Sequence, residues 1–410
     1  MPFDSQKNEL AQGGCLPTIP VMLAGSAAFL NLYATQPLLP LLARTFGASA
    51  FTAGLTVTAP AIVIAICAPF IGGFADTFGL RRVIVASAFL LAVATALAAT
   101  SGSLGQLILW RLVQGVMTPG IFAGTVAYIH ETWPSERAGR GTAAYMTGTI
   151  LGGFTGRLVA GLVAADANWH LSFVALAILS VGVAAALYVW LPGEGSAHAR
   201  ATPQRTREKR DWIGLLRNRQ LLATFAIGSC ILFTQVAMFT YVTFHLAAPP
   251  FGLSTAALGW LFVVYLLGAA VTPLGGSWID RYGHRAGLAS AMGIGACGAM
   301  LTLMPWLPAI LLGLALTSTG VFIAQSTTSS YIGAVTTRDR GLAVGLYSTF
   351  YYAGGSVGAA APAAVWSTGG WPACVFLIVA VQTAGVVVAL TCWTRRSAAR
   401  SFEPAIEAVP

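Results

Sequence analysis

The chain has 410 residues, of which 56% are apolar and only 9% are charged. A soluble globular domain carries roughly 25% charged residues, so this composition excludes a water-soluble protein of this size. The net charge of +9 is better explained by membrane topology than by nucleic-acid binding, and we expect no nucleic-acid partner.

Twelve long apolar segments predict membrane-spanning helices. About 20 residues, rising ~1.5 Å each, cross ~30 Å of hydrocarbon, and lipid forces the backbone to bond to itself within a helix. The expected spans are 19–43, 53–74, 83–101, 106–129, 141–165, 171–192, 220–247, 256–278, 287–304, 307–333, 341–367 and 371–393. The predicted fold is an all-α membrane protein of two pseudo-symmetric six-helix bundles.

Lysine and arginine predict the orientation. With the N-terminus in the cytoplasm, 19 of the 22 Lys and Arg residues fall on the cytoplasmic side. Only Arg44 lies outside, and Arg111 and Arg157 lie within helices. No cleavable signal peptide is evident. We therefore expect a multi-pass protein of the bacterial inner membrane with both termini in the cytoplasm.

One polar and basic segment, 193–219, divides the chain. It separates an expected N-terminal bundle (19–192) from a C-terminal bundle (220–393), with cytoplasmic tails at 1–18 and 394–410. The segment is expected to set the orientation, and its positive charge is suited to anionic lipid head groups.

The two halves share a motif. The pattern Pro-x-x-Gly-x-x-x-Asp-x-x-Gly-x-Arg begins at Pro69 and again at Pro273, each time between the second and third helices of its half. The glycines, aspartate and arginine of the motif are Gly72, Asp76, Gly79 and Arg81 in the first copy and Gly276, Asp280, Gly283 and Arg285 in the second. Such internal repeats are typical of secondary transporters.

The first copy, Gly72–Arg82, resembles the signature loop of the major facilitator superfamily. Arg111-x-x-Gln114-Gly115 resembles the family's helix 4 motif. The run Gly148-x-x-x-Gly152-Gly153-x-x-Gly156 is similar to the helix 5 motif of the twelve-helix drug:proton antiporters. Gly153 replaces the motif's Pro and Arg157 its final Gly, which resembles the acriflavine-sensitivity and sugar-efflux-like group.

The repeated loops are candidate gates. Gly72 and Gly79 permit close approach and a tight turn, and Asp76 is suited to accept hydrogen bonds there. Arg81 and Arg82 can reach acids near helix 4. We expect a cytoplasmic latch that also includes Glu131, Glu136 and Arg140, and in the second half Gly276, Asp280, Gly283 and Arg285. The alternative is a role in insertion and turn formation only.

The glycines Gly148, Gly152, Gly153 and Gly156 predict close helix packing, because small residues at four-residue spacing let backbones approach in lipid. The resemblance implies that helix 8 is their partner.

Arg111 and Arg157 are the sharpest candidates for function. An arginine at a helix centre costs roughly 2.5–3.5 kcal/mol on insertion scales, so it faces a polar interior. Gln114 and Thr118 follow Arg111 on one helix face. The two arginines either bind an anionic or polar substrate or tune a proton carrier, or they bond to backbone carbonyls as internal glue.

Other polar and aromatic residues are predicted to line the path on helices 1, 7, 10 and 11, which the resemblance places around the centre. They are Asn31, Tyr33, Gln36, Gln235, Tyr241, Gln325 and Tyr347. Helix–helix hydrogen bonding, or packing for the aromatic residues, is the alternative for each.

None of the 13 acidic residues lies in the middle of a predicted helix. Cationic drugs and proton carriers commonly require such a carboxylate, so we favour neutral or anionic substrates. If protons are coupled, the carrier is a helix-end acid such as Asp76 or Glu131, or His245. No nucleotide loop, metal cluster or catalytic constellation is evident, so we expect neither cofactor nor enzyme activity.

The sequence therefore predicts a monomeric exporter or exchanger of small molecules that works by alternating access. Two alternatives stay open: a proton- or anion-coupled importer of organic anions or sugars, and a membrane sensor that transports nothing.

Overall fold

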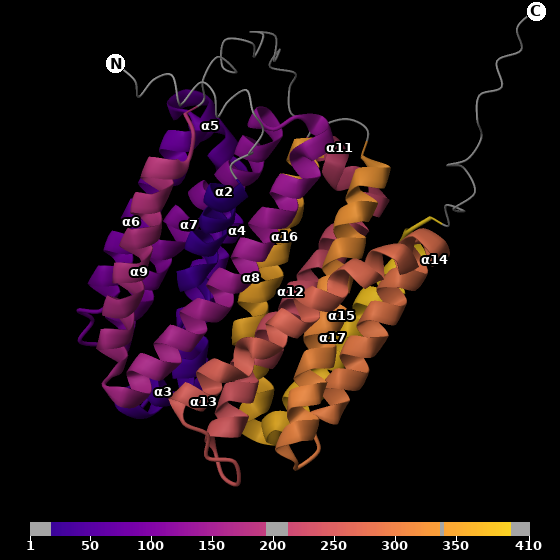
Figure 1. Ribbon diagram of the computed structural model, residues 1–410. Coiled ribbons are helices and arrows are strands. Elements are labelled where there is room, and N and C mark those ends of the chain that lie inside the picture. The colour runs from indigo at the N-terminus through magenta and orange to yellow at the C-terminus, as the bar shows by residue number, and fades with distance from the viewer. Residues whose placement is uncertain (1–17, 194–211, 337–339, 395–410) are drawn as a thin grey trace, which may run out of the picture. The chain divides into compact units, whose positions relative to one another are not determined.

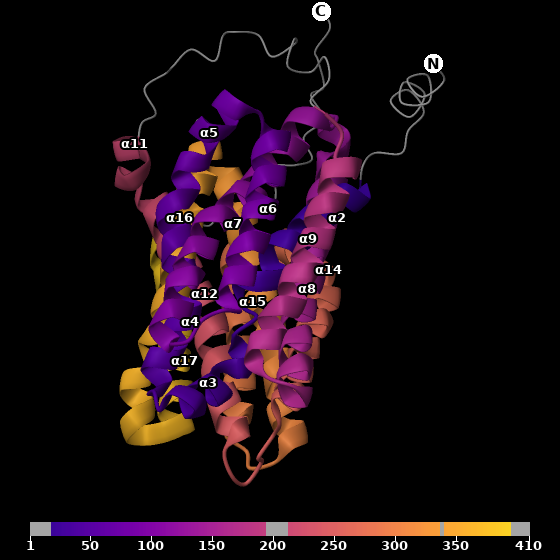
Figure 2. The same cartoon turned by 90° about the vertical axis from the view of Figure 1, so that its left-hand side faces the viewer.

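The computed structural model describes residues 18–193, 212–336 and 340–394. Helices are the regular structure of these ranges, and no strand occurs in them. The all-helical fold class is confirmed. Within each of the two units described below, the axes of the long helices are roughly parallel, and successive helices alternate in direction (Figures 1 and 2).

The helices follow the order of the predicted spans. The first half contains α2 (Thr18–Leu32), η1 (Gln36–Leu38), α3 (Leu39–Phe46), α4 (Ala50–Cys67), η2 (Ala68–Phe70), α5 (Ile71–Phe78), α6 (Leu80–Ala98), α7 (Leu104–Thr132), α8 (Ser135–Asp166) and α9 (Trp169–Trp190). The second half contains α11 (Trp212–Arg217), α12 (Arg219–Ala247), α13 (Thr255–Trp260), η3 (Leu261–Val263), α14 (Val264–Leu301), α15 (Leu307–Val335), α16 (Arg340–Ala360) and α17 (Pro362–Cys392).

Nine helices in the described ranges are long and apolar enough to cross a membrane. The other three predicted spans correspond to α13 with the first part of α14, the second part of α14, and α16. Gly283 divides α14, since its φ of +82° interrupts the helix. Gly370, with φ of +57°, likewise divides α17 at the predicted boundary between helices 11 and 12.

Gly79 and Gly283 make the same turn in the two copies of the repeated motif. Gly79 lies between α5 and α6 with φ of +84°, and Gly283 has φ of +82°. Residues with a Cβ rarely adopt this region, whereas glycine does so at little cost. The predicted tight turn is thus present in both halves.

The chain forms two compact units. The first is drawn from Met1–Glu208 and Leu246–Phe262, and the second from Lys209–His245 and Val263–Pro410. The first crossing between the units, at Glu208–Lys209, falls within the predicted linker 193–219, whereas α13 joins the first unit. α13 packs closely against α8 at Gly161. Glycine permits this close packing, because a methyl group at position 161 would lie 2.5 Å from the carbonyl oxygen of Thr255 in α13.

A row of glycines on α8 packs against α2, the first part of helix 1. A Cβ on Gly148 or Gly156 would overlap the backbone of α2, and one on Gly152 would lie 2.5 Å from the Cα of Ser26. Ser26 Oγ also donates to the carbonyl of Gly148 at 3.0 Å. The resemblance implied predicted helix 8 as the partner of this row, whereas the row packs against α2; predicted helix 8, which begins with α13, meets α8 at Gly161 instead. Gly161, which meets α13, lies about 140° further round α8 at ~100° per residue.

The second unit repeats this seam. A Cβ on Gly358 of α16 would lie 2.6 Å from the carbonyl oxygen of Phe233 in α12, and Gly354 faces Ser229. Ser229 Oγ donates across to the carbonyl of Phe350 at 2.7 Å. Each unit therefore joins its first and fifth helices by close backbone contact and a serine hydrogen bond.

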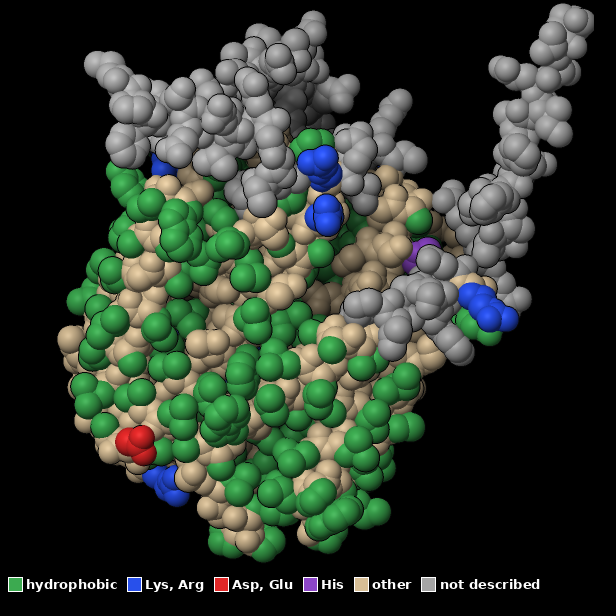
Figure 3. Space-filling view, viewed as in Figure 1, with side chains coloured by type: hydrophobic (Ala, Val, Ile, Leu, Met, Phe, Trp, Pro, Cys, Tyr) green, Lys and Arg blue, Asp and Glu red, His purple; other side chains and the backbone are tan. Residues whose placement is uncertain are grey.

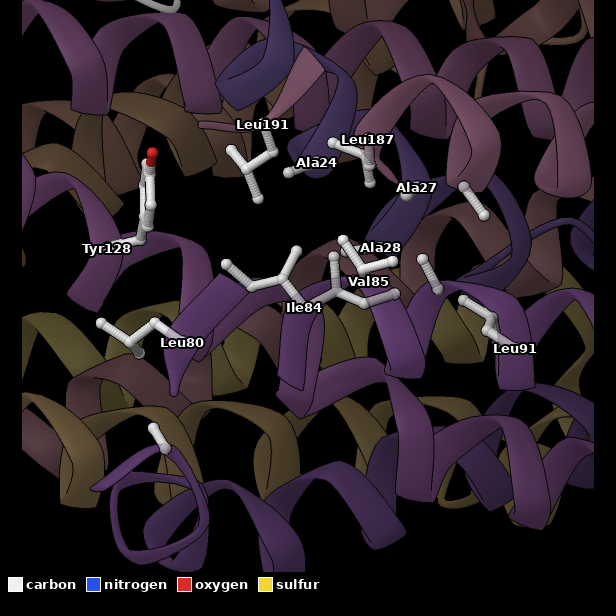
Figure 4. Close-up of a cluster of buried hydrophobic side chains, with 14 residues drawn as sticks. Ala24, Ala27, Ala28, Leu80, Ile84, Val85, Leu91, Tyr128, Leu187 and Leu191 are labelled. Carbon is white, nitrogen blue, oxygen red and sulfur yellow. The ribbon is translucent and has the colours of Figure 1, made fainter. Parts of the chain in front are cut away.

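Small and branched apolar side chains fill the core of the first unit. One cluster brings together α2, α6, α7 and α9 through residues such as Ala28, Ile84, Tyr128 and Leu187 (Figure 4). Hydrophobic side chains are spread over much of the face seen in Figure 3, and the few described charged ones visible there lie in its upper part, at its right and at its lower left. This distribution suits helices that contact lipid.

Candidate functional site

Helix 1 is broken near its middle. α2 ends at Leu32, residues 33–35 form a turn, and η1 and α3 follow. Pro37 and Pro40 carry no amide hydrogen, so the regular i→i−4 bonds cannot continue here. The amide of Gln36 instead donates to the carbonyl of Tyr33 at 3.1 Å. The break leaves carbonyl oxygens at the end of α2 that need other donors.

Arg111 of α7 supplies those donors. Its NH1 donates to the carbonyl of Asn31 at 2.8 Å, and its NH2 donates to that of Leu32. Its Nε donates to the carbonyl of Thr56 at 2.9 Å. In a regular helix the amide of residue 60 would donate to the Thr56 carbonyl, but Pro60 has no amide hydrogen. The Thr56 carbonyl is therefore left open within its own helix. Arg111 thus binds two helices at the points where prolines interrupt them.

The bonds of Arg111 continue into a polar network between helices. NH1 also donates to Gln114 Oε1, and Gln114 Nε2 donates to Thr95 Oγ1 of α6 at 2.8 Å. Thr118 Oγ1, one turn along α7, donates to the Gln114 carbonyl at 2.8 Å. Arg111 is fully buried, and all of its hydrogen-bond partners are neutral oxygens. These bonds to backbone carbonyls are the contacts that the alternative of internal glue requires.

Asn31 extends the polar region to α9. Its Nδ2 donates to Ser180 Oγ at 2.9 Å. Its Oδ1 is buried and has no hydrogen-bond partner among the residues that the structure describes, and the same is true of Thr35 Oγ1 in the turn. Two unsatisfied oxygens therefore lie at the break of helix 1. Such groups cost free energy in a dry interior unless water or a ligand binds them.

Arg157 of α8 contacts the other side of the same break. Its Nε donates to Gln36 Oε1 at 2.8 Å, and its NH1 donates to the Gly153 carbonyl at 2.7 Å. The guanidinium carbon lies 5.0 Å from the ring centroid of Tyr33 and 4.6 Å from that of Phe262 in η3. We call Arg157, Tyr33, Gln36 and Phe262 the arginine cage.

The two arginines place positive charge in the interior of the first unit. Among the residues whose side chains the structure describes, they are the only charged side chains that are buried, at 0% and 3% exposure. Both contact the segment 31–36. The arrangement concentrates positive charge at the break of helix 1, which favours a bound anion and disfavours a cation.

In the second unit, several predicted path residues are buried and neutral. Gln235 Oε1 and the hydroxyl of Tyr347 have no hydrogen-bond partner in the described part of the chain. Tyr241 instead donates to the carbonyl of Ala359 at 3.0 Å and so joins α12 to α16. Gln325 is half-buried on α15. Gln235 and Tyr347 thus retain polar atoms available to a ligand.

Sequence reasoning missed several polar and aromatic contributors. Thr56, Thr95, Ser180 and Phe262 lacked any distinguishing pattern, because serine, threonine and phenylalanine are common in apolar helices. Gln382 had a usable signal as a lone amide within an apolar helix. Its side chain is 1% exposed, and neither its amide oxygen nor its amide nitrogen has a hydrogen-bond partner within the described ranges.

The model of the Major Facilitator Superfamily matches residues 21–254 and 246–408 of the chain. The chain belongs to this superfamily.

Bacterial relatives support the assignment. An uncharacterized MFS-type transporter of Bacillus subtilis (strain 168), YybF, is 30% identical over 357 residues, which cover 86% of this chain and 87% of that protein. The inner membrane transport protein YnfM of Escherichia coli (strain K12) is 29% identical over 359 residues, covering 86% and 85%. This superfamily member is therefore a multi-pass membrane protein of the secondary transporter class, not an enzyme.

A solved structure shows the same fold. A crystal structure of a mutant of the nucleoside transporter NupG aligns with a TM-score of 0.72 over 92% of this chain and 100% of its own chain. The sequences are 14% identical, so the similarity concerns the fold alone.

The superfamily's signature loop is described in part. Gly72, Asp76, Gly276 and Asp280 lie outside the described side chains, as does Glu136 of the predicted latch. Arg82, Glu131 and Arg140 are exposed, and Arg285 is half-buried.

Arg81 binds the end of α9. Its Nε donates to the Leu191 carbonyl at 2.7 Å and its NH2 to that of Tyr188 at 2.6 Å. A cation at the C-terminal end of a helix complements both the open carbonyls and the helix dipole. The loop is thereby tied to the start of the segment that links the two halves.

Proposed function

We propose that the protein exports or exchanges small molecules across the bacterial inner membrane by alternating access. The superfamily supplies the transport class. The observation that supports the location of the path is the break in helix 1, which two buried arginines contact from α7 and α8. A break held by a few hydrogen bonds can adopt a second arrangement, as alternating access requires.

The arginine cage and the open polar atoms are the proposed substrate path. Arg157, Tyr33, Gln36 and Asn31 contribute from the first unit, and Gln235, Tyr347 and Gln325 from the second. Arg111, Gln114 and Thr118 are proposed as positioning residues, because their bonds hold α2, α4 and α6 in place. Tyr241 is proposed to act in the same way between α12 and α16.

The gates and coupling are proposed from sequence. The repeated Asp76 and Asp280 loops are proposed as the cytoplasmic latch, with both termini in the cytoplasm. Protons are the proposed coupling ion, carried by a helix-end acid. The helix 5 motif supports membership of the drug- and sugar-efflux-like branch, and we propose that the protein works as a monomer.

A proton- or anion-coupled importer of organic anions or sugars is the second candidate. The two buried arginines favour it, because exporters of cationic drugs commonly use a buried acid. The direction of net flux distinguishes an importer from an exporter.

Flux in proteoliposomes tests the proposal. Purified protein is reconstituted with pooled labelled solutes, and a pH gradient is imposed in each direction. We expect flux of at least one neutral or anionic solute that depends on the gradient and exceeds that of empty liposomes. Absence of flux in both directions would favour a sensor.

A further inference from the structure

We infer that the arginine cage binds the carboxylate of a small organic anion with an apolar or aromatic body, and that the anion replaces Gln36 and an aromatic ring at Arg157. This inference rests on the proposed transport function and names its substrate class.

Charge is the first reason. The described side chains include no buried acid, whereas Arg111 and Arg157 are both buried. Arg111 is surrounded by neutral oxygens, so its charge is spread over dipoles and not cancelled. Both guanidinium groups contact the segment 31–36, where their fields add. An anion at this place relieves the repulsion of two like charges in a low-dielectric interior.

The contacts of Arg157 are the second reason. Two of its hydrogen-bond partners, Gln36 Oε1 and the Gly153 carbonyl, are neutral. A carboxylate matches the planar guanidinium fork and forms charge-assisted bonds that are roughly twice as strong as neutral ones. The carboxylate therefore competes well for the Nε position that Gln36 now occupies. Arg111 is less suited to such exchange, because four bonds to three backbone carbonyls and to Gln114 hold it in place.

The two rings favour an organic ion over an inorganic one. Tyr33 and Phe262 lie within 5.0 Å and 4.6 Å of the guanidinium carbon. When one ring moves aside, an apolar or aromatic body can fill its place against the other ring. Chloride or sulfate would leave that space unfilled, which costs contact energy.

Binding of an anion at the arginine cage would also affect the segments that must move during transport. Tyr33 and Gln36 belong to the break of helix 1, and Phe262 is the last residue of the first unit before the chain enters the second. An anion that releases Gln36 or Phe262 from Arg157 frees the break or the crossing segment. Substrate binding is thereby coupled to the elements that alternating access must move.

Thermal unfolding of purified full-length protein in detergent tests the inference. The probes are benzoate, cyclohexanecarboxylate and hexanoate, each compared with its neutral amide at constant ionic strength and neutral pH. The variants are Arg157→Gln, Arg157→Lys and the control Arg44→Gln, which removes an exposed arginine of the same unit. Dissociation constants come from the rise of the unfolding midpoint with probe concentration.

We expect at least one carboxylate to stabilise the wild type and its amide to have no effect. Arg157→Gln should weaken that binding by about tenfold or more, Arg157→Lys by less, and Arg44→Gln should leave it unchanged. If Arg157→Gln does not fold, Phe262→Leu gives the second measurement. This variant loses the aromatic ring, so it should weaken the binding of benzoate more than the binding of hexanoate.

Three results would overturn the inference. They are carboxylates that stabilise no better than their amides, equal stabilisation by chloride, and undiminished carboxylate binding in Arg157→Gln. The flux measurement is separate. Flux of a neutral solute without carboxylate binding would overturn only this inference, whereas carboxylate binding without any flux would overturn the proposed function.

Discussion

Arg111 shows how a helix break creates a requirement for a cation. Thr56 is followed four residues later by Pro60, and α2 ends shortly before Pro37, so open carbonyls occur on two neighbouring helices. The guanidinium of Arg111 reaches both sets. Its five donors in a fixed plane serve several carbonyls at once, which a lysine cannot do with the same geometry.

We expect Arg111→Gln to lower the free energy of unfolding by about 2–4 kcal/mol, because each buried carbonyl left without a donor costs about 1–3 kcal/mol. In a Pro60→Ala background the cost should fall by about 1 kcal/mol, because the alanine amide at position 60 can donate to Thr56. Unfolding of the two single variants and the double variant in detergent measures this coupling.

The control for this cycle is Arg44→Gln, which removes an exposed arginine and should change stability by less than about 0.5 kcal/mol. Strictly additive effects of the two changes would contradict the role assigned to the Thr56 carbonyl.

At the scale of elements, helix 5 uses different faces for different neighbours. Gly148, Gly152 and Gly156 let α8 approach α2, and Gly161 lets it approach α13. In the sequence, the four-residue spacing of these glycines identified the face of the helix that packs closely, but it did not identify the helix that packs against that face. The serine bond from Ser26 to Gly148 fixes the register of the seam.

We expect Gly152→Ala to destabilise the protein by about 1–3 kcal/mol, because the added methyl group forces α2 and α8 apart. Gly358→Ala should act similarly on the corresponding seam of the second unit. Gly182→Ala is the matched control, since it lies in a membrane helix with nothing within 4 Å of an added Cβ. Its effect should be neutral or stabilising by up to ~1 kcal/mol. Equal unfolding midpoints for Gly152→Ala and Gly182→Ala would disprove the seam.

At the scale of the whole molecule, the helix order and the two copies of the glycine turn follow the repeat seen in the sequence. The chain passes between the two units at His245–Leu246 and again at Phe262–Val263, as well as in the linking segment. α13, although it belongs to the C-terminal half of the sequence, is therefore part of the first unit. Both short crossings flank a loop that is predicted to face the periplasm.

Reporter fusions test this topology. A reporter inserted after Ala248 should show periplasmic activity, and one placed at Arg205 should show cytoplasmic activity, because lysine and arginine are retained on the cytoplasmic side. A fusion after Trp190 provides an internal check with the cytoplasmic result. The same compartment for the first two fusions would remove one span from the predicted twelve.

The sequence by itself determined the membrane class, the helix order and the superfamily, because apolar length, charge asymmetry and glycine turns are local properties that the bilayer and the backbone enforce. It also identified Arg111, Arg157 and the residues near Asn31 and Gln36 as unusual, since charge and amide groups are costly in lipid. The turn at Gly79 and its copy at Gly283 were predictable for the same reason.

Only the tertiary structure decided what these residues contact. Arg111 bonds to carbonyls at the break of helix 1 and to the Thr56 carbonyl, which Pro60 leaves open. Arg157 contacts the rings of both Tyr33 and Phe262, which are more than 200 residues apart in the chain. The partner of the glycine row and the union of α13 with the first unit also emerged only there. Such contacts depend on which faces of distant helices meet, and periodicity within one helix defines a face without defining its neighbour.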